Sequence, residues 1–151
     1  MKHRISVGAF VIRDDTVLMV NHRRADRYDF WVAPGGGVKE IESLEEAVIR
    51  EVKEETSLIV TVRELLYIEE MYNAEERSVK FWYHCEFIGG QLDCSAKEAV
   101  DEHIVNVKFM GKKELEDNII FPPMIQNELW KDIEIENKAP KFIELRKMEF
   151  Y

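Results

Sequence analysis

A glycine-rich turn that leads into one charged helix, residues 36–58, constrains this chain more than any other feature of its sequence. Ser43 and Glu46 have the spacing of a capping box. In that motif the Ser side chain accepts a hydrogen bond from a free amide of the first turn, and the Glu side chain accepts one from the Ser amide. The sequence therefore predicts a helix over residues 43–56.

The inner face of this helix changes character along its length. At about 100° per residue, one stripe turns inward, and its aliphatic members are Leu44, Ala47, Val48 and Val52. Glu51 and Glu55 fall within the same stripe, and Glu54 lies at its edge. Carboxylates at this spacing repel one another and lie near the negative end of the helix dipole. A positive group must therefore lie in front of them.

A hard divalent cation is the group that fits. The ligands are all oxygens, which suits Mg²⁺ or Mn²⁺, whereas zinc prefers His or Cys. Arg50 lies one turn from both Glu46 and Glu54, so it can orient a carboxylate ligand. The alternative, a solvated acidic helix end, is typical of an isolated run of glutamates. It does not account for the glycine turn, the capping box and the inward phase together.

The same residues match a family motif. The stretch resembles the Nudix box, whose defining positions are here Gly36, Glu42, Arg50, Glu51, Val52, Glu54, Glu55 and Leu58. Ser57 stands where the family has glycine. That glycine ends the helix in a left-handed conformation, so a serine implies strain of about 1 kcal/mol or a different exit from the helix. The departure removes no ligand.

The resemblance implies a fold and a set of roles. Nudix domains have an α/β (α+β) fold, an α/β/α sandwich around a mixed β-sheet, and the likeness covers about residues 3–130. By position, the expected metal ligands are Glu51, Glu54, Glu55 and the Gly35 carbonyl. The expected catalytic residues are Glu51, Arg50 and Glu54, with Glu54 as a third ligand or as the base that orients water.

A further carboxylate often completes such a site. The segment before the strand at residues 104–110 offers Glu98, Asp101 and Glu102. Glu98 best matches the glutamate that MutT-type members place ahead of that strand. The alternative is a solvated acidic loop.

Substrate contacts are expected from the glycine turn and from residues outside the helix. Gly36 and Gly37 belong to the turn, and Arg23 and Arg24 carry forks that fit phosphate. Asn127 follows a Phe-Pro-Pro segment that resembles the one in MutT-type enzymes, where an Asn reads the base, although the spacing differs. Aromatic candidates for stacking on a base are Tyr28, Trp31, Tyr72, Trp82 and Phe121, with core packing as the alternative.

Composition narrows the class of protein. With 151 residues, 46% of them hydrophobic, one domain over residues 1–151 is expected. The net charge of −9 argues against sequence-independent binding to DNA or RNA. Two cysteines without ligand spacing, no membrane-length apolar run and no secretory signal favour a cytoplasmic protein without membrane partners.

Hydrophobic periodicity and turn residues predict the other elements. Strands are expected at residues 5–12, 17–21, 30–33, 58–62, 65–71, 78–88, 104–110 and 141–150, and helices at 112–118 and 122–132. Their order lacks a regular βαβ rhythm, which indicates a mixed sheet covered by helices. The C-terminal extension, about residues 131–151, lies outside the resemblance, and an exposed strand edge there is compatible with a homodimer.

The resemblance to the Nudix box, with the carboxylates of the helix, implies a Mg²⁺- or Mn²⁺-dependent pyrophosphohydrolase. Its expected substrate is a nucleoside di- or triphosphate derivative, such as a nucleotide sugar or a MutT-type nucleoside triphosphate. One alternative is an ADP-ribose-type pyrophosphatase, although the proline that marks many of these enzymes about fifteen residues past the box is absent. Another is a non-catalytic nucleotide-sensing module, which usually lacks box glutamates that this chain retains.

Overall fold

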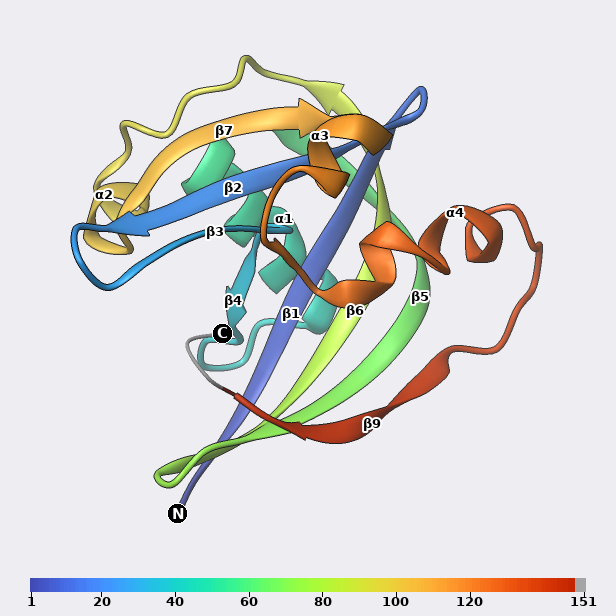
Figure 1. The fold of residues 1–151 in the computed structure, drawn as a ribbon. Helices are drawn as coiled ribbons and strands as arrows, with labels where there is room; N and C mark the ends of the chain where they lie inside the picture. The colour runs from blue at the N-terminus through green and yellow to red at the C-terminus, as the bar shows by residue number, and fades with distance from the viewer. Residues whose placement is uncertain (149–151) are drawn as a thin grey trace.

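The computed structural model describes residues 1–148 and contains one curled, mixed sheet of nine strands (Figure 1). The strands are β1 (Lys2–Arg13), β2 (Thr16–Arg24), β3 (Tyr28–Val32), β4 (Gly35–Gly37), β5 (Ile59–Tyr72), β6 (Glu76–Gly89), β7 (Ile104–Met110), β8 (Ile120–Phe121) and β9 (Lys141–Lys147). The helices are α1 (Leu44–Thr56), α2 (Lys97–Asp101), α3 (Lys112–Glu116), the 3₁₀ turn η1 (Pro123–Gln126) and α4 (Leu129–Asp132).

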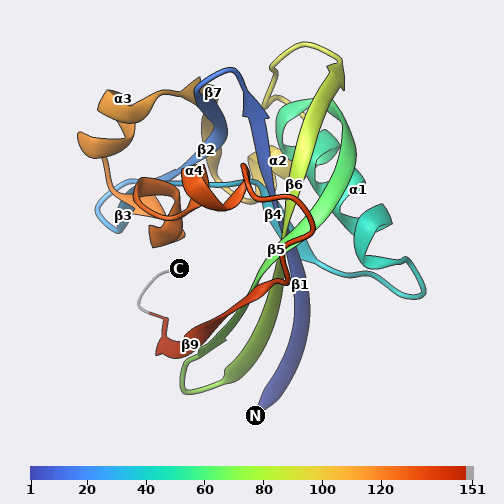
Figure 2. The same ribbon diagram turned by 90° about the vertical axis from the view of Figure 1, so that its right-hand side faces the viewer.

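The sheet divides into two wings that meet at the turn between β1 and β2. The long wing contains β1, β6, β5 and β9, and the short wing contains β2, β3, β7 and β8. β1 runs parallel to β6 along most of its length but pairs with β2 only where the two strands turn into each other, at Ile12 and Arg13. The wings therefore diverge from this junction, as Figure 2 shows, and residues of both wings line one pocket.

Helices cover both faces of the sheet. On one face α1 buries Ala47, Val48 and Val52 against aliphatic residues of β1 and β5. On the other face, Leu115 of α3, Ile125 of η1 and Leu129 of α4 pack on a second cluster of buried residues. The strand alternation predicted from the sequence produces this arrangement, because successive residues of β1 point to opposite faces. The predicted α/β architecture with helices on both sides of a mixed sheet is confirmed.

Three elements differ from the pattern-based prediction. The two strands expected at residues 58–62 and 65–71 are one strand, β5, whose register shifts around Leu65. The helix expected at residues 122–132 is interrupted, because Asn127 has φ −131° and ψ −84° and separates η1 from α4. β9 ends at Lys147, and the last residues of the strand expected at 141–150 lie outside the described part of the chain.

The capping box that starts α1 is confirmed. The Glu46 amide donates to Ser43 Oγ at 3.1 Å, and the Ser43 amide donates to Glu46 Oε2 at 2.8 Å. At the other end of the helix, Ser57 has φ 64°, in the left-handed region. The position therefore keeps the conformation that glycine favours, despite the serine.

Replacing Ser57 tests this strain directly. Ser57→Gly and Ser57→Ala both lose the hydrogen bond from Ser57 Oγ to the Asp93 carbonyl, but only the glycine variant also loses the Cβ. We expect Ser57→Gly to be more stable than Ser57→Ala by about 1 kcal/mol, or roughly 2–4 °C in Tm. Thermal unfolding of the two variants measures the difference. Equal melting temperatures would show that the left-handed serine costs nothing.

In the described part of the chain, no helix is long and apolar enough to cross a membrane. β9 forms the outer edge of the long wing, and Phe142 on it is 75% exposed. The homodimer expected from such an edge stays a prediction.

Candidate active site

Three carboxylates converge beside the space between the wings. Glu51 and Glu55 come from successive turns of α1, and Glu102 lies between α2 and β7. One oxygen atom from each lies within 4.8 Å of the others. Glu51 and Glu55 are only 4% and 2% exposed, so the inward phase predicted from the helical pattern is confirmed.

Burial and mutual repulsion affect the pKa values of the carboxyl groups in this cluster. Burial raises the pKa of Glu55 well above its usual value, the charges of Glu102 and Glu51 raise it further, and a backbone hydrogen bond with Gly35 opposes the rise. Burial and the charge of Glu51 also raise the pKa of Glu102. Among the described residues, Glu55 Oε2 is buried and has no hydrogen-bond partner. Such an atom fits a ligand position for a cation.

The glycine turn makes room for the carboxylates. A Cβ on Gly36 would lie 2.5 Å from the Glu51 carboxylate, and one on Gly35 would lie 2.2 Å from the Val7 carbonyl oxygen. Both glycines belong to β4, which pairs with β1. Only glycine therefore allows the strand to approach this closely. Oxygen donors in a cradle of this kind fit Mg²⁺ or Mn²⁺.

Arg50 holds the turn and the helix together. Its guanidinium donates to Glu42 at 2.5 and 3.0 Å, to Glu51 at 2.7 Å, to Glu54 at 3.2 Å and to the Gly37 carbonyl at 2.9 Å. The bonds from Arg50 to Glu42 lower the pKa of Glu42 to about 2. The predicted contact with Glu54 forms, but the one with Glu46 does not, because the capping box already occupies Glu46.

A pocket of about 460 Å³ opens between the wings next to these carboxylates. Its short-wing wall is aromatic. The His22 ring stacks on Phe30 at a centroid distance of 5.4 Å and an angle of 10°, and Tyr28 lies 5.5 Å from Phe30. Burial lowers the pKa of His22, which favours the neutral imidazole. The wall therefore presents flat, uncharged rings.

The long-wing wall carries a buried cation. Lys80 of β6 is 5% exposed, and its Nζ lies 4.3 Å from the centroid of the Trp82 ring. Burial lowers the pKa of Lys80 to about 8, although the charges of Glu69 and Glu55 oppose this shift. The ammonium form therefore still predominates near neutral pH. Sequence reasoning missed Lys80, although the alternation of β6 places it on the same face as the buried Trp82.

The other candidate carboxylates lie beside the cluster. Glu54 and Glu98 line a neighbouring groove that also reaches Glu51 and Glu102. Glu98 is exposed on α2 and lies outside the group of three. Of the three residues that the sequence left open, the structure thus favours Glu102 as the third carboxylate. The reason is that α2 packs against α1, so that the residue after its last turn lies beside Glu51 and Glu55.

Several expected substrate contacts lie elsewhere. Arg23 and Arg24 are exposed at the end of β2 and do not line the pocket. Arg4, near the start of β1, does line it. Asn127 lines a separate pocket with Gln126 and Trp130, because the break between η1 and α4 directs it away from the carboxylates. Gly36 lines the main pocket, and Gly37 lines the neighbouring groove.

Of the aromatic candidates for stacking on a base, some line the pocket and others belong to the core. Tyr28 lines the pocket, whereas Trp31 and Trp82 are buried in the core. Phe121 packs edge-on against Phe30 at 5.5 Å, behind the aromatic wall. Phe30 itself was missed, because its position in a short strand carries no signal that separates a pocket wall from the core.

Sequence comparison finds related proteins that match part of this chain. The chain is 32% identical over 99 residues to an ADP-ribose pyrophosphatase of Methanocaldococcus jannaschii, a match that covers 63% of this chain and 59% of the relative. It is 36% identical over 99 residues to the 8-oxo-dGDP phosphatase NUDT18 of Danio rerio, covering 65% of this chain and 29% of that protein. The chain thus spans less than two thirds of the length of either relative.

Structural and family comparisons agree with each other. A NUDIX hydrolase from Nitrosomonas europaea superposes with a TM-score of 0.74 at 21% identity, covering 92% of this chain and 93% of that one. This likeness shows the fold. The model of the NUDIX domain matches residues 2–127, which include the glycine turn, α1 and Glu102. The chain therefore belongs to the NUDIX domain family, as the residues of the turn and helix predicted.

Proposed function

We propose that the protein is a Mg²⁺- or Mn²⁺-dependent pyrophosphohydrolase that cleaves the diphosphate linkage of a nucleoside di- or triphosphate derivative. The observation that carries this proposal is the carboxylate cluster. Glu51, Glu55 and Glu102 lie within 4.8 Å of one another beside a pocket, and the buried Glu55 Oε2 has no partner among the described residues. A site built only to stabilise the fold gains nothing from this repulsion.

The residues of the chain divide the work. Glu51, Glu55 and Glu102 would hold the cation, which would neutralise phosphate charge and lower the pKa of the attacking water. Arg50 orients Glu51 and Glu54 through hydrogen bonds of 2.7 and 3.2 Å. Glu54, at the edge of the cluster, remains our candidate for the base that accepts a proton from the attacking water. Attack on phosphorus then breaks the anhydride bond.

Other residues neutralise and orient the substrate. The Lys80 ammonium lies in the pocket wall and supplies positive charge for a phosphate group, which a protein of net charge −9 must provide locally. The stacked rings of His22 and Phe30 offer a flat surface for a planar base. The relatives named for ADP-ribose and for 8-oxo-dGDP support a nucleoside diphosphate derivative as the substrate class. ADP-ribose itself stays an alternative within this class.

A substrate panel tests the proposal. Nucleotide sugars, dinucleoside polyphosphates, ADP-ribose and oxidised nucleoside triphosphates are assayed with Mg²⁺, with Mn²⁺ and with EDTA. We expect at least one diphosphate linkage to be cleaved with metal, and EDTA to lower the rate by roughly a hundredfold or more. A phosphate monoester, which lacks the anhydride, serves as the control substrate. If the protein cleaves nothing in the panel and calorimetry detects no uptake of Mg²⁺ or Mn²⁺, the proposal is wrong.

A further inference from the structure

The C-terminal strand contributes to the pocket although it lies outside the span that matches the NUDIX domain. The family match ends at residue 127, and β9 begins at Lys141. β9 pairs in parallel with β5, from Tyr67 opposite Lys141 to Tyr72 opposite Lys147. It carries the chain to Met148, whose amide donates to the Tyr72 carbonyl at 2.8 Å. Met148 lines the same pocket as Glu55.

An ion pair with a buried carboxylate fixes β9 to β5 and β6. Arg146 Nε donates to Glu69 Oε1 at 2.8 Å, and Trp82 Nε1 donates to Glu69 Oε2 at the same distance. Glu69 is fully buried, so these donors compensate the cost of removing its carboxylate from water. The Arg146 guanidinium also lies 3.1 Å from Met71 Sδ, and Met71 is another residue of the pocket wall. The extension and the wall are therefore packed as one unit.

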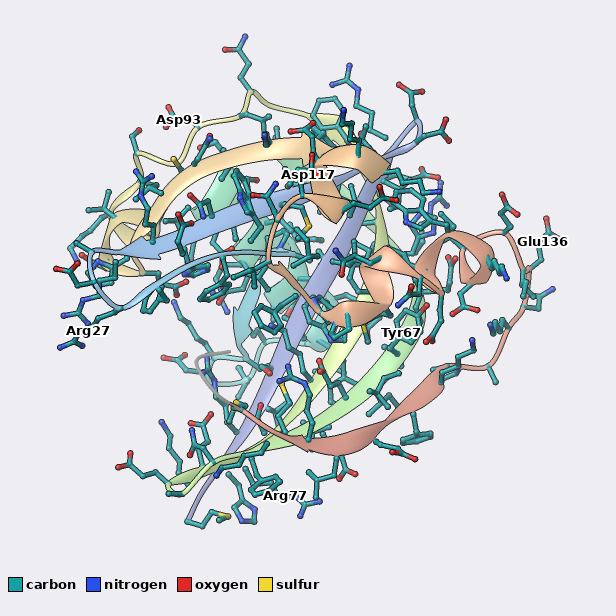
Figure 3. All side chains as sticks on the ribbon, viewed as in Figure 1. Arg27, Tyr67, Arg77, Asp93, Asp117 and Glu136 are labelled. Carbon is teal, nitrogen blue, oxygen red and sulfur yellow. The ribbon has the colours of Figure 1, made fainter. Side chains whose placement is uncertain are left out.

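The start of β9 is fixed as well. Asp132, at the end of α4, is 4% exposed and accepts hydrogen bonds from Lys138 and Lys141 and from the Tyr67 hydroxyl. Tyr67, labelled in Figure 3, belongs to β5, and its side chain reaches Asp132 at the end of α4. Both ends of the extension are thus anchored to buried acidic residues. An unattached tail does not require such anchors.

The two walls of the pocket offer complementary surfaces to a ring. Met71 and Met148 present polarizable thioether side chains from the long wing, and His22 and Phe30 present stacked rings from the short wing. Thioethers adapt to the faces and edges of aromatic groups. Surfaces of these two kinds suit a planar base, and Lys80 and Glu55, which line the same pocket, would then face the diphosphate.

We infer that Met148, held by β9, is a specificity-determining residue that contacts the base of the nucleoside and limits its size. The inference rests on the proposed function, because it assigns the part of the substrate beyond the diphosphate. Since the residue comes from the extension, base selection would depend on a segment that the family domain does not supply.

Two substitutions of Met148 test this role with ADP-glucose and UDP-glucose, which differ only in the base. Met148→Trp fills the pocket, and we expect kcat/KM for the adenine substrate to fall at least tenfold more than for the uracil substrate. Met148→Ala removes the contact, and we expect KM to rise severalfold for the preferred substrate while kcat stays within twofold. The split between KM and kcat separates base contact from general damage to the fold.

Phe142→Ala and Leu145→Ala are the matched controls, since these side chains lie on the same strand and are 75% and 46% exposed. Both variants should keep the wild-type ratio of adenine to uracil turnover. If wild type cleaves either sugar nucleotide but neither Met148 variant shifts this ratio by more than twofold, the inference is wrong and the proposed function stands. If wild type cleaves none of the diphosphate substrates, the proposed function fails and the inference fails with it.

Discussion

Glu55→Gln should lower Mg²⁺-dependent kcat/KM by roughly a hundredfold or more, while making the metal-free protein more stable. The side chain is 2% exposed, and its carboxylate lies beside those of Glu51 and Glu102. An amide of the same shape removes this repulsion, which we expect to add about 1 kcal/mol to the free energy of unfolding without metal. Steady-state kinetics and thermal melts, each with and without Mg²⁺, measure both effects.

The melts give a second, independent signature. In the wild type, Mg²⁺ at about 100 times its Kd should add roughly 2.7 kcal/mol to the free energy of unfolding, because the ion binds only the folded state. In Glu55→Gln this gain should largely vanish. Glu45→Gln makes the same chemical change at an exposed position in the first turn of α1 and should behave like wild type in both assays. Wild-type turnover in Glu55→Gln would exclude Glu55 as a metal ligand.

Arg50→Met should destabilise the protein by roughly 3 kcal/mol and also impair catalysis, because it leaves several partly buried carboxylates without their donor. The guanidinium, whose side chain is 22% exposed, bonds Glu42, Glu51 and Glu54 as well as the Gly37 carbonyl. Arg50→Lys keeps the charge but loses the fork, so we expect a smaller loss of stability. Urea unfolding at neutral pH measures the changes in the free energy of unfolding.

The stability of Arg50→Met should also depend less on acid. Arg50 lowers the pKa of Glu42 from 4.5 to about 2, so in the wild type this pair stabilises the fold above pH 4.5 and is lost as the pH falls toward 2. The variant lacks this component of acid sensitivity. Lys53→Met removes one positive charge from an exposed position on the same helix and should leave stability and activity within experimental error of wild type. An equal effect in both variants would reduce the role of Arg50 to net charge.

The part of the site that the sequence predicts is the part encoded locally. The phase of Glu51 and Glu55 follows from helical geometry once the capping box fixes where the helix begins. The position of the helix end follows in the same way, whereas the sequence left open whether Ser57 is strained there or leaves the helix differently. Each of these inferences requires only the residues of one turn and one helix.

The part of the site that the sequence does not predict depends on contacts between distant segments of the chain. Glu102 joins the cluster because α2 ends beside α1, and no periodicity within residues 95–103 distinguishes it from Glu98. Lys80 and Met148 enter the pocket through the pairing of β6 and β9 with their neighbours, at registers that the sequence does not specify. Asn127 leaves the site because a backbone break, invisible in the hydrophobic pattern, redirects the chain.

The division of the sheet at β1 has a consequence for engineering. A graft of residues 36–58 onto another scaffold would transfer two of the clustered carboxylates and Arg50, because these belong to one continuous piece of chain. The graft would leave behind Glu102, Lys80 and most of both pocket walls, which come from segments outside residues 36–58. Two of the three clustered carboxylates are therefore portable on one short segment, whereas the third carboxylate and the pocket exist only in the complete architecture.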